Sequence, residues 1–588
     1  MTDQSPVVRD LDVSAADALP EPVTRRGLSR TVAAGLAAAA TAPLISGGPA
    51  EAAWGPKHAK NCHHWHRCKK HRRHTCRHKH RCKHLNHKAP KPTKPPPKPP
   101  VPTGPQVDPV FVRSALPTAW SLHLGSRFSY GVTPDLHRQM KAAGSPERWF
   151  EQQLKPAAIP DAATDATQGW WTSINADYAT IWKRDQDKTE SGWSAMANYA
   201  RWCLVRRASS TRQVLEVMTE FWENHLHVPV HDDGVFTYRA QYGKLLRAQA
   251  LGRFDQMLVA AITHPAMGIS LDNASSTKQS PNENLGRELL ELHTVGRGNY
   301  SEDDVKSSAR ILTGYRVDMW RTWDSTYDPA SHWTGPVQVM GFSHDNPKSD
   351  GRYVAEAYLT YLARHPKTAA RIARKLAVRF VSDRPSDQLV AHLAQVYLAN
   401  GTAIQPVLRA LVAHPEFRAS AGLKVRTPTD DLIATYRALG AHVVQPTDGS
   451  SAANSMLDQA DSIGQSPFAW SRPDGQPQDN LSWSSATRVL ASFQVHYSVA
   501  GGWWPKQGVT YQTPLSRVPT PGMRFDVLVD HLCIQMLGKR APARLVQAAS
   551  LATQTGVAES ITATHPIVRW KMPMLLTTLL DSPDHLHR

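Results

Sequence analysis

The sequence predicts a mainly α-helical protein, in which a large multi-helix domain follows a disordered N-terminal tail and linker. Apolar residues recur at helical spacing from about Ser114 onward, whereas strand-like alternation is scarce. The segment before this point is rich in histidine, basic residues and then proline, and it has few apolar residues to bury. We divide the 588 residues into four parts, 1–53, 54–88, 89–109 and 110–588.

The first part, residues 1–53, has the pattern of an export signal. Arg25 and Arg26 precede an alanine-rich apolar run, and Ala50-Glu51-Ala52 is a small-x-small cleavage candidate. The paired arginines resemble the twin-arginine class of bacterial signal peptides. The run is too short to span a bilayer, and no later stretch reaches ~18 uninterrupted apolar residues. We therefore expect an exported protein, secreted or associated with the cell envelope, without a transmembrane span in the mature chain.

The second part, residues 54–88, is strongly cationic and contains four cysteines. Residues 57–98 carry 15 lysines and arginines and no acidic residue, which accounts for most of the net charge of +18. Three interpretations stay open: a disordered tail that contacts anionic polymers of the cell envelope, a pair of disulfides, or a metal site. The candidate metal ligands are Cys62, Cys68, Cys76, Cys82, His64, His66, His78 and His80.

The third part, residues 89–109, reads as a proline-rich linker. Such a sequence favours extended polyproline II at ~3.1 Å per residue and therefore forms a semi-rigid spacer. Beyond this linker the charge is nearly balanced, so the basic character of the whole chain does not imply a nucleic-acid partner. A P-loop and a glycine-rich dinucleotide loop are both missing from the sequence, which disfavours nucleotide chemistry.

The fourth part, residues 110–588, contains a series of amphipathic helical patterns separated by glycines and prolines. Val214, Met218, Phe221 and His225 share one face of a helix that begins after Ser210. Further helices are expected at 371–381, 388–398, 404–412, 429–439 and 524–537, and at 301–314, where Ser301 and Asp304 form a capping box.

The stretch SPNENLGRELLELHTVG, residues 280–296, predicts one more capped helix. Ser280 and Glu283 match a capping box with Pro281 at the first helical position, and Gly296 is placed to end the helix in a left-handed conformation. Polar residues gather on one arc and leucines on another. The polar positions are Asn284, Arg287, Glu288 and Glu291.

Several stretches in order resemble the bacterial DUF1800 family, which is known only as a domain of unknown function. The resemblance extends from about residue 114 to residue 588, and it implies an exported protein with a mainly helical body and no established reaction. The segments that carry it are HLGSRFSYG (123–131), GSPERWFEQQL (144–154), FWENHLHV (221–228), HPAMGISLDN (264–273), PNENLGRELLELHTVG (281–296), YSEDDV (300–305), ARILTGY (309–315), HPKTAARIARKLAVRFVSD (365–383), HPEF (414–417) and GQSPFAWSRPDG (464–475).

Two interpretations of the polar arc remain open. It can be the solvated face of an ordinary helix, with Arg287 and Glu291 forming an i,i+4 ion pair. Alternatively, polar groups from neighbouring helices converge into a catalytic or divalent-metal site, although His225 on an apolar face is more often a core residue. The candidate catalytic residues are then His225, Glu288, Glu291, Arg287 and Arg310, and the candidate metal ligands are Asp272, His225 and Glu288.

Two classes of function follow from these patterns. The first is an exported enzyme, a hydrolase or oxidoreductase assisted by a divalent metal, that acts on an envelope or extracellular polymer. The second is a non-catalytic envelope scaffold, or a protein that binds anionic polymers or glycans through its basic tail and some of its 18 tryptophans. The sequence alone does not decide whether the protein is an enzyme.

Overall fold

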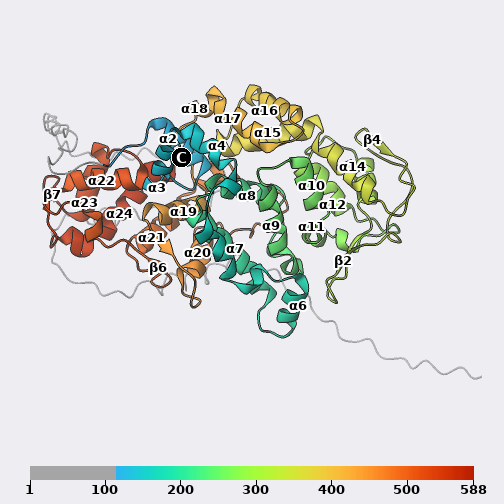
Figure 1. Ribbon diagram of the computed structural model, residues 1–588, viewed down its shortest axis with the longest axis horizontal. Helices are drawn as coiled ribbons and strands as arrows, with labels where there is room; N and C mark the ends of the chain where they lie inside the picture. The colour runs from blue at the N-terminus through green and yellow to red at the C-terminus, as the bar shows by residue number, and fades with distance from the viewer. Residues whose placement is uncertain (1–113) are drawn as a thin grey trace, which may run out of the picture. The chain divides into compact units, whose positions relative to one another are not determined.

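The computed structural model describes residues 114–588, all of which belong to the compact unit Pro97–Arg588 (Figure 1). The predicted signal peptide, the His/Cys-rich segment and the proline-rich segment lie outside the described residues, so the expectations for them stay predictions. In the first half of the described chain the α-helices are α2 (Ala119–Phe128), α3 (Pro134–Ala142), α4 (Pro146–Gln153), α5 (Ala162–Ala166), α6 (Tyr178–Gln186), α7 (Gly192–Ser209), α8 (Gln213–His225), α9 (Arg239–Gln249), α10 (Phe254–Ile262), α11 (Pro265–Ser270), α12 (Glu283–Glu288) and α13 (Glu302–Ile311).

The second half continues the helical pattern, which confirms the predicted fold class. Its α-helices are α14 (Arg352–Ala363), α15 (Pro366–Phe380), α16 (Asp387–Ala399), α17 (Ile404–Ala413), α18 (Pro415–Ala419), α19 (Pro428–Ala438), α20 (Ala452–Ser462), α21 (Ala486–Ala500), α22 (Phe525–Leu537), α23 (Ala543–Thr553), α24 (Met572–Leu580) and α25 (Pro583–Leu586). Neighbouring helices such as α15, α16 and α17 lie side by side (Figure 1).

The β-structure of the described residues consists of four small antiparallel pairs. They are β1 (Tyr315–Val317) with β2 (Ser325–Tyr327), β3 (Val337–Val339) with β4 (Phe342–His344), β5 (His442–Val443) with β6 (Val509–Thr510), and β7 (Met523–Arg524) with β8 (Ser560–Ile561). Within this part of the chain, no helix is long and apolar enough to cross a membrane, in agreement with the sequence.

Histidine-proline pairs begin three of the helices. The Nδ1 atoms of His264, His365 and His414 each accept a hydrogen bond from the backbone N–H two residues further on, at 3.2–3.3 Å. The proline that follows each histidine occupies the first helical turn, where its missing N–H costs nothing. These histidines therefore act as N-caps of α11, α15 and α18, which is a structural role.

The central stretch 280–296 forms a helix that differs from the prediction. Its α-helical part is α12, capped by Asn282, whose side chain accepts from the Asn284 N–H at 2.9 Å. The predicted capping box is wrong, because Ser280 lies in a turn in which its backbone exchanges hydrogen bonds with Thr277. From Leu289 to His293 the helix continues as a π-helix, a form often found at functional sites.

A close contact between α12 and α13 holds this central helix in place. A Cβ atom added at Gly286 would lie 2.9 Å from the backbone nitrogen of Ala309 and 3.1 Å from the carbonyl oxygen of Val305. Glycine therefore allows the two helices to approach backbone to backbone. The predicted capping box of Ser301 and Asp304 is present at the start of α13.

Candidate functional site

The C-terminal ends of α8 and of the π-helix are joined by two histidines. His225 Nε2 donates to the carbonyl oxygen of His293 at 3.1 Å, and His293 Nδ1 donates to the carbonyl oxygen of His225 at 2.9 Å. Both side chains are buried, which confirms that His225 points inward. Burial lowers the pKa of His293 to about 3 and that of His225 well below its usual range, so both rings are neutral. His225 Nδ1 and His293 Nε2 are consequently hydrogen-bond acceptors.

Lys375 of α15 donates to the first of these acceptors. Its Nζ atom lies 2.9 Å from His225 Nδ1. Burial, together with the positive charge of Arg371, lowers the pKa of the Lys375 amine to about 7. The second acceptor, His293 Nε2, is buried and has no hydrogen-bond partner among the described residues. An amine with a pKa near neutrality thus lies beside two neutral imidazoles.

The loop 464–475 carries a carboxylate, that of Asp474, which acts on the charge of Lys375. Asn224, at the end of α8, receives a hydrogen bond from the Gln476 N–H at 2.7 Å and donates to the Gln476 carbonyl oxygen at 2.9 Å. Gly475 has a φ of +76°, and a Cβ atom there would lie 2.0 Å from the Asn224 carbonyl oxygen. Glycine is therefore required at this position. The neighbouring Asp474 raises the pKa of Lys375 against the effect of burial.

Glu288 is the acidic member of the group that comes from the central helix. Its half-buried carboxyl makes no hydrogen bond or ion pair within the described part of the chain. Burial and the neighbouring charge of Glu291 raise its pKa, and Asp474 adds to this effect. We call His225, His293, Lys375, Glu288 and Asp474 the Lys375 cluster. It contains two of the residues that the sequence predicted, His225 and Glu288.

The other predicted residues have partners elsewhere. Arg287 binds Glu302 of α13 at 2.6 Å, whereas Glu291 accepts from Tyr300 at 2.5 Å and from Arg297 at 2.8 Å. The predicted Arg287–Glu291 ion pair is therefore wrong, because each side chain meets a partner on the segment that follows the helix.

Two further predicted residues also make contacts outside the Lys375 cluster. Asp272 is exposed and accepts from the Asn284 side chain at 3.0 Å. Arg310 lies over the ring of Trp333, 4.9 Å from its centroid. No hydrogen bond or ion pair among the described residues joins Asp272, His225 and Glu288, so the metal site proposed for these three stays a prediction.

The Lys375 cluster has the groups that acid–base chemistry needs. A lysine with a pKa near neutrality can take up a proton or attack a carbonyl carbon at neutral pH, which an ordinary lysine cannot do. A carboxyl with a raised pKa can supply the proton that a leaving group requires. Titratable groups whose pKa values are shifted toward neutrality in this way are found preferentially at functional sites.

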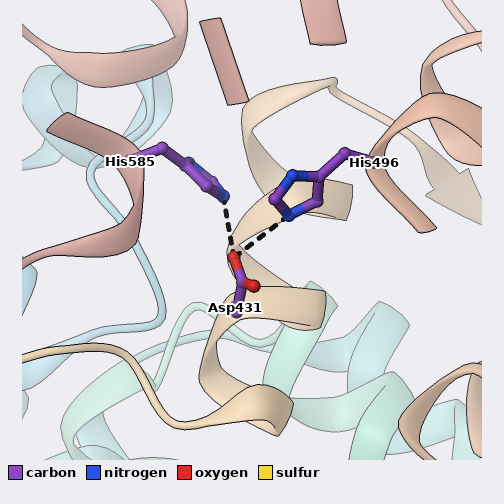
Figure 2. A group of neighbouring side chains, drawn as sticks. All are labelled: Asp431, His496 and His585. Carbon is purple, nitrogen blue, oxygen red and sulfur yellow. Dashed lines mark hydrogen bonds and ion pairs between the residues drawn. The ribbon is translucent and has the colours of Figure 1, made fainter. Parts of the chain in front are cut away.

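A second polar group lies in the C-terminal half, where Asp431 of α19, His496 of α21 and His585 of α25 meet. Figure 2 shows both imidazoles pointing at the same carboxylate oxygen of Asp431. His496 Nε2 and His585 Nε2 each lie 3.2 Å from that oxygen, and all three side chains are buried. We call these residues the Asp431 group. Among the described residues it is the set whose ligand atoms are close enough together to hold a metal ion.

The surroundings of the Asp431 group fix its geometry. Asp581 lies 2.8 Å from His496 Nδ1, and Arg488 binds the second oxygen of Asp431 at 3.2 Å. Burial opposes protonation of His496, but the two carboxylates outweigh it and raise the pKa of this histidine to about 9. Two histidines and one carboxylate, with a second carboxylate orienting one ring, are a ligand set that divalent metals use. Without a metal, the same atoms form a hydrogen-bonded ion network.

Sequence reasoning missed most of these residues. The members of the Asp431 group are far apart along the chain, so no local spacing reveals them. The sequence did contain an indication of Lys375, because this lysine lies beside the apolar face that Ile372, Leu376 and Phe380 form on α15. A lysine on such a face is unusual unless its amine has a specific environment.

The fold and the Lys375 cluster define a mainly helical protein in which α8, the central helix and α15 place a lysine with a lowered pKa beside two neutral histidines. Asp474 acts on the charge of this lysine and also on that of Glu288. The chain belongs to the DUF1800 family, described as a protein of unknown function, and the family model matches residues 123–587. Comparisons with curated proteins and with solved structures find no match.

Proposed function

We propose that this protein is an exported hydrolase that acts on an envelope or extracellular polymer, with the Lys375 cluster as its reaction centre. The observation that supports it most is the Lys375 amine, which is held 2.9 Å from a neutral histidine and has a pKa of about 7. Export is supported by the paired arginines and the apolar run in residues 1–53. A polymer substrate is supported by the cationic segment and the proline-rich spacer that precede the helical body.

In this proposal each member of the cluster has a separate task. The neutral Lys375 amine takes a proton from the attacking water or hydroxyl group, and His225 holds the amine in position through its Nδ1 atom. Glu288, with its raised pKa, donates a proton to the leaving group. The unpartnered His293 Nε2 accepts a hydrogen bond from the attacking group. General acid–base catalysis of this kind contributes typically ~10²–10⁴-fold to a rate.

The first experiment tests the lysine without knowledge of the substrate. The mature protein is labelled with a limiting amount of an acylating reagent at pH values from 5 to 11, and the modification of each lysine is measured by peptide mass spectrometry. We expect Lys375 to react with a midpoint near pH 7, whereas an ordinary lysine side chain has a pKa of ~10.4. A Lys375 midpoint above pH 9 would remove the proposed base.

The second experiment measures hydrolysis of isolated envelope polymers by the wild-type protein, Lys375→Met and the matched control Lys306→Met. We expect Lys375→Met to lose activity by at least ~10²-fold, while the control keeps it. Equal activity in both variants, with the fold intact by circular dichroism, would exclude the Lys375 cluster as the reaction centre.

A metal-assisted enzyme is the second candidate, and the geometry of the Asp431 group favours it. A divalent ion bound there would act as a Lewis acid, and Asp581 would orient His496 toward it. The alternative without catalysis is an envelope scaffold that binds anionic polymer through its basic tail. Polymer binding that persists in Lys375→Met but is lost when residues 54–105 are removed, with no hydrolysis by any variant, would favour the scaffold.

A further inference from the structure

A cavity of about 270 Å³ lies beside α2, α19, α22 and α25, and its charged lining is mainly cationic. Four basic side chains and one acidic side chain line it, namely Arg426, Arg437, Lys539, Arg588 and Asp584. The single acidic residue is already paired, since Lys539 lies 2.9 Å from Asp584. No other carboxylate of the described residues lines the cavity beside its three guanidinium groups.

Two of these guanidinium groups have no acidic partner. Arg426 is only 6% exposed, its Nε donates to the carbonyl oxygen of His585 at 2.7 Å, and its Nη1 has no hydrogen-bond partner. Arg437 donates from Nη1 to the carbonyl oxygen of Ala208 at 3.0 Å, and its buried Nε has no partner. Neither residue forms an ion pair within the described part of the chain. Buried charges are normally paired, because an isolated one is costly to remove from water.

The nearby carboxylates do not remove this excess of positive charge. Arg588 binds Asp430 at 2.9 Å, but Arg379 binds the same carboxylate at 3.0 Å. Burial and the positive charge of Arg426 lower the pKa of Arg437 to about 10, as expected where a balancing anion is missing. Asp430 and Asp431 oppose the effect of burial on the pKa of Arg426, but neither forms an ion pair with it, so Arg426 and Arg437 keep no acidic partner within the described residues.

Part of the remaining wall of the cavity is apolar, next to the polar side chains of Ser126, Thr133 and three histidines. The apolar part is formed by side chains of α2, α19 and α22 and by a residue of the loop after α2, namely Leu122, Val132, Ala434, Ala438, Met536 and Leu537. A ligand that fits this cavity has an anionic end for the arginines and a short apolar body for the opposite wall. Its size is limited, because the volume is at the lower end of the range of small-molecule sites.

We propose that this cavity binds a small organic anion, whose carboxylate or phosphate accepts hydrogen bonds from Arg426 and Arg437 while a short aliphatic body contacts the apolar wall. The cavity shares no residue with the Lys375 cluster, so this proposal is independent of hydrolysis at that cluster, although His585 of the Asp431 group also lines the cavity.

The experiment uses the full mature protein with hexanoate, inorganic phosphate and the neutral analogue 1-hexanol as probes. Binding is measured by isothermal titration calorimetry and by the midpoint of thermal unfolding. We expect saturable binding of hexanoate, weaker binding of phosphate and none of 1-hexanol. Arg437→Met should weaken hexanoate binding at least tenfold, whereas the control Arg409→Met, which removes an exposed guanidinium paired with Glu151, should leave it unchanged.

A second variant keeps the test decisive if Arg437→Met does not fold. Ala438→Leu fills part of the cavity from a half-buried position, without removing a charge. It should weaken hexanoate binding at least tenfold and leave phosphate binding close to that of the wild type. This difference distinguishes the contribution of the ligand's apolar body from that of its anionic end. Absence of saturable binding of both anions, or hexanoate binding that neither variant weakens, would overturn the proposal.

Discussion

The positions of protons decide what the Lys375 cluster can do. Each histidine donates one ring N–H to the backbone carbonyl of the other. The second ring nitrogen of each histidine therefore has a lone pair that can accept a hydrogen bond. The Lys375 amine donates to this nitrogen in His225. The sequence predicted the inward position of His225 because periodicity reveals which face of a helix is buried. It could not predict the contact with Lys375, which lies 150 residues further along the chain and meets His225 only when α8 and α15 pack together.

The lowered pKa of Lys375 predicts how stability depends on pH. Between pH ~7 and ~10.4 the unfolded chain binds a proton at this lysine that the folded protein releases, so the free energy of unfolding rises with pH in this window. The expected gain is roughly 2–4 kcal/mol, since ~1.4 kcal/mol corresponds to each pH unit and Lys375 is only partly buried. Urea unfolding from pH 6 to 10.5 measures it. We expect Lys375→Met to lack this rise and Lys306→Met to retain it. If the free energy of unfolding depends on pH in the same way in both variants and in the wild type, the lowered pKa of Lys375 is contradicted.

Helices were the elements that the sequence predicted best. The expected helices at 371–381, 388–398, 404–412, 429–439 and 524–537 correspond to α15, α16, α17, α19 and α22, and most of their ends agree within two residues. The central helix was predicted less well. Its change to a π-helix after Glu288 accompanies the bond between His293 and the end of α8, which is a tertiary contact that a local pattern does not contain.

The close contact of α12 with α13 predicts that Gly286 tolerates no larger side chain. Gly286→Ala would place a methyl group 2.9 Å from the Ala309 backbone nitrogen, and the two helices would have to separate. We expect a loss of about 1–3 kcal/mol in the free energy of unfolding, as in other overpacked contacts. Gly449→Ala is the matched control, because a Cβ there has open space. Denaturant unfolding compares the two, and equal stability of both variants would show that α12 can shift without cost.

At the scale of the whole molecule, a buried ion network connects helices that are distant in sequence. Arg379 of α15 binds both Asp430 of α19 and Glu220 of α8, at 3.0 and 3.1 Å, and all three side chains are largely shielded from water. Charged residues in amphipathic helices are usually interpreted as solvated, so a sequence pattern cannot identify such a network. The order of tail, linker and helical body was easier to predict, because composition changes sharply near residue 110.

This network predicts a large effect from removing one charge. Asp430→Asn leaves Arg379 and Arg588 facing each other without their shared carboxylate. We expect the free energy of unfolding to fall by about 3–5 kcal/mol, as when one partner of a buried pair is removed. Asp387→Asn breaks the exposed pair with Arg374 and should cost about 0–1 kcal/mol. If urea unfolding finds the two losses equal, the buried network does not hold the helices together.

The location of bound metal would show whether the tail or the helical body holds a metal site. The two candidate places are the His/Cys-rich segment and the Asp431 group. If the Asp431 group supports a metal-assisted enzyme, a chain that begins at Pro105 should take up about one equivalent of Zn²⁺ or Fe²⁺ after incubation and dialysis, measured by mass spectrometry of the metal. Uptake should increase from pH 6 to pH 8.5, because the metal must replace protons on its ligands.

His585→Ala should abolish the uptake, while His392→Ala, which changes a histidine outside the group, should not. Metal that is bound by the full mature chain but not by the shortened one would instead assign it to Cys62, Cys68 and the neighbouring histidines of the tail. The Asp431 group would then be a hydrogen-bonded network that joins α19, α21 and α25, and catalysis by the body would depend on the Lys375 cluster alone.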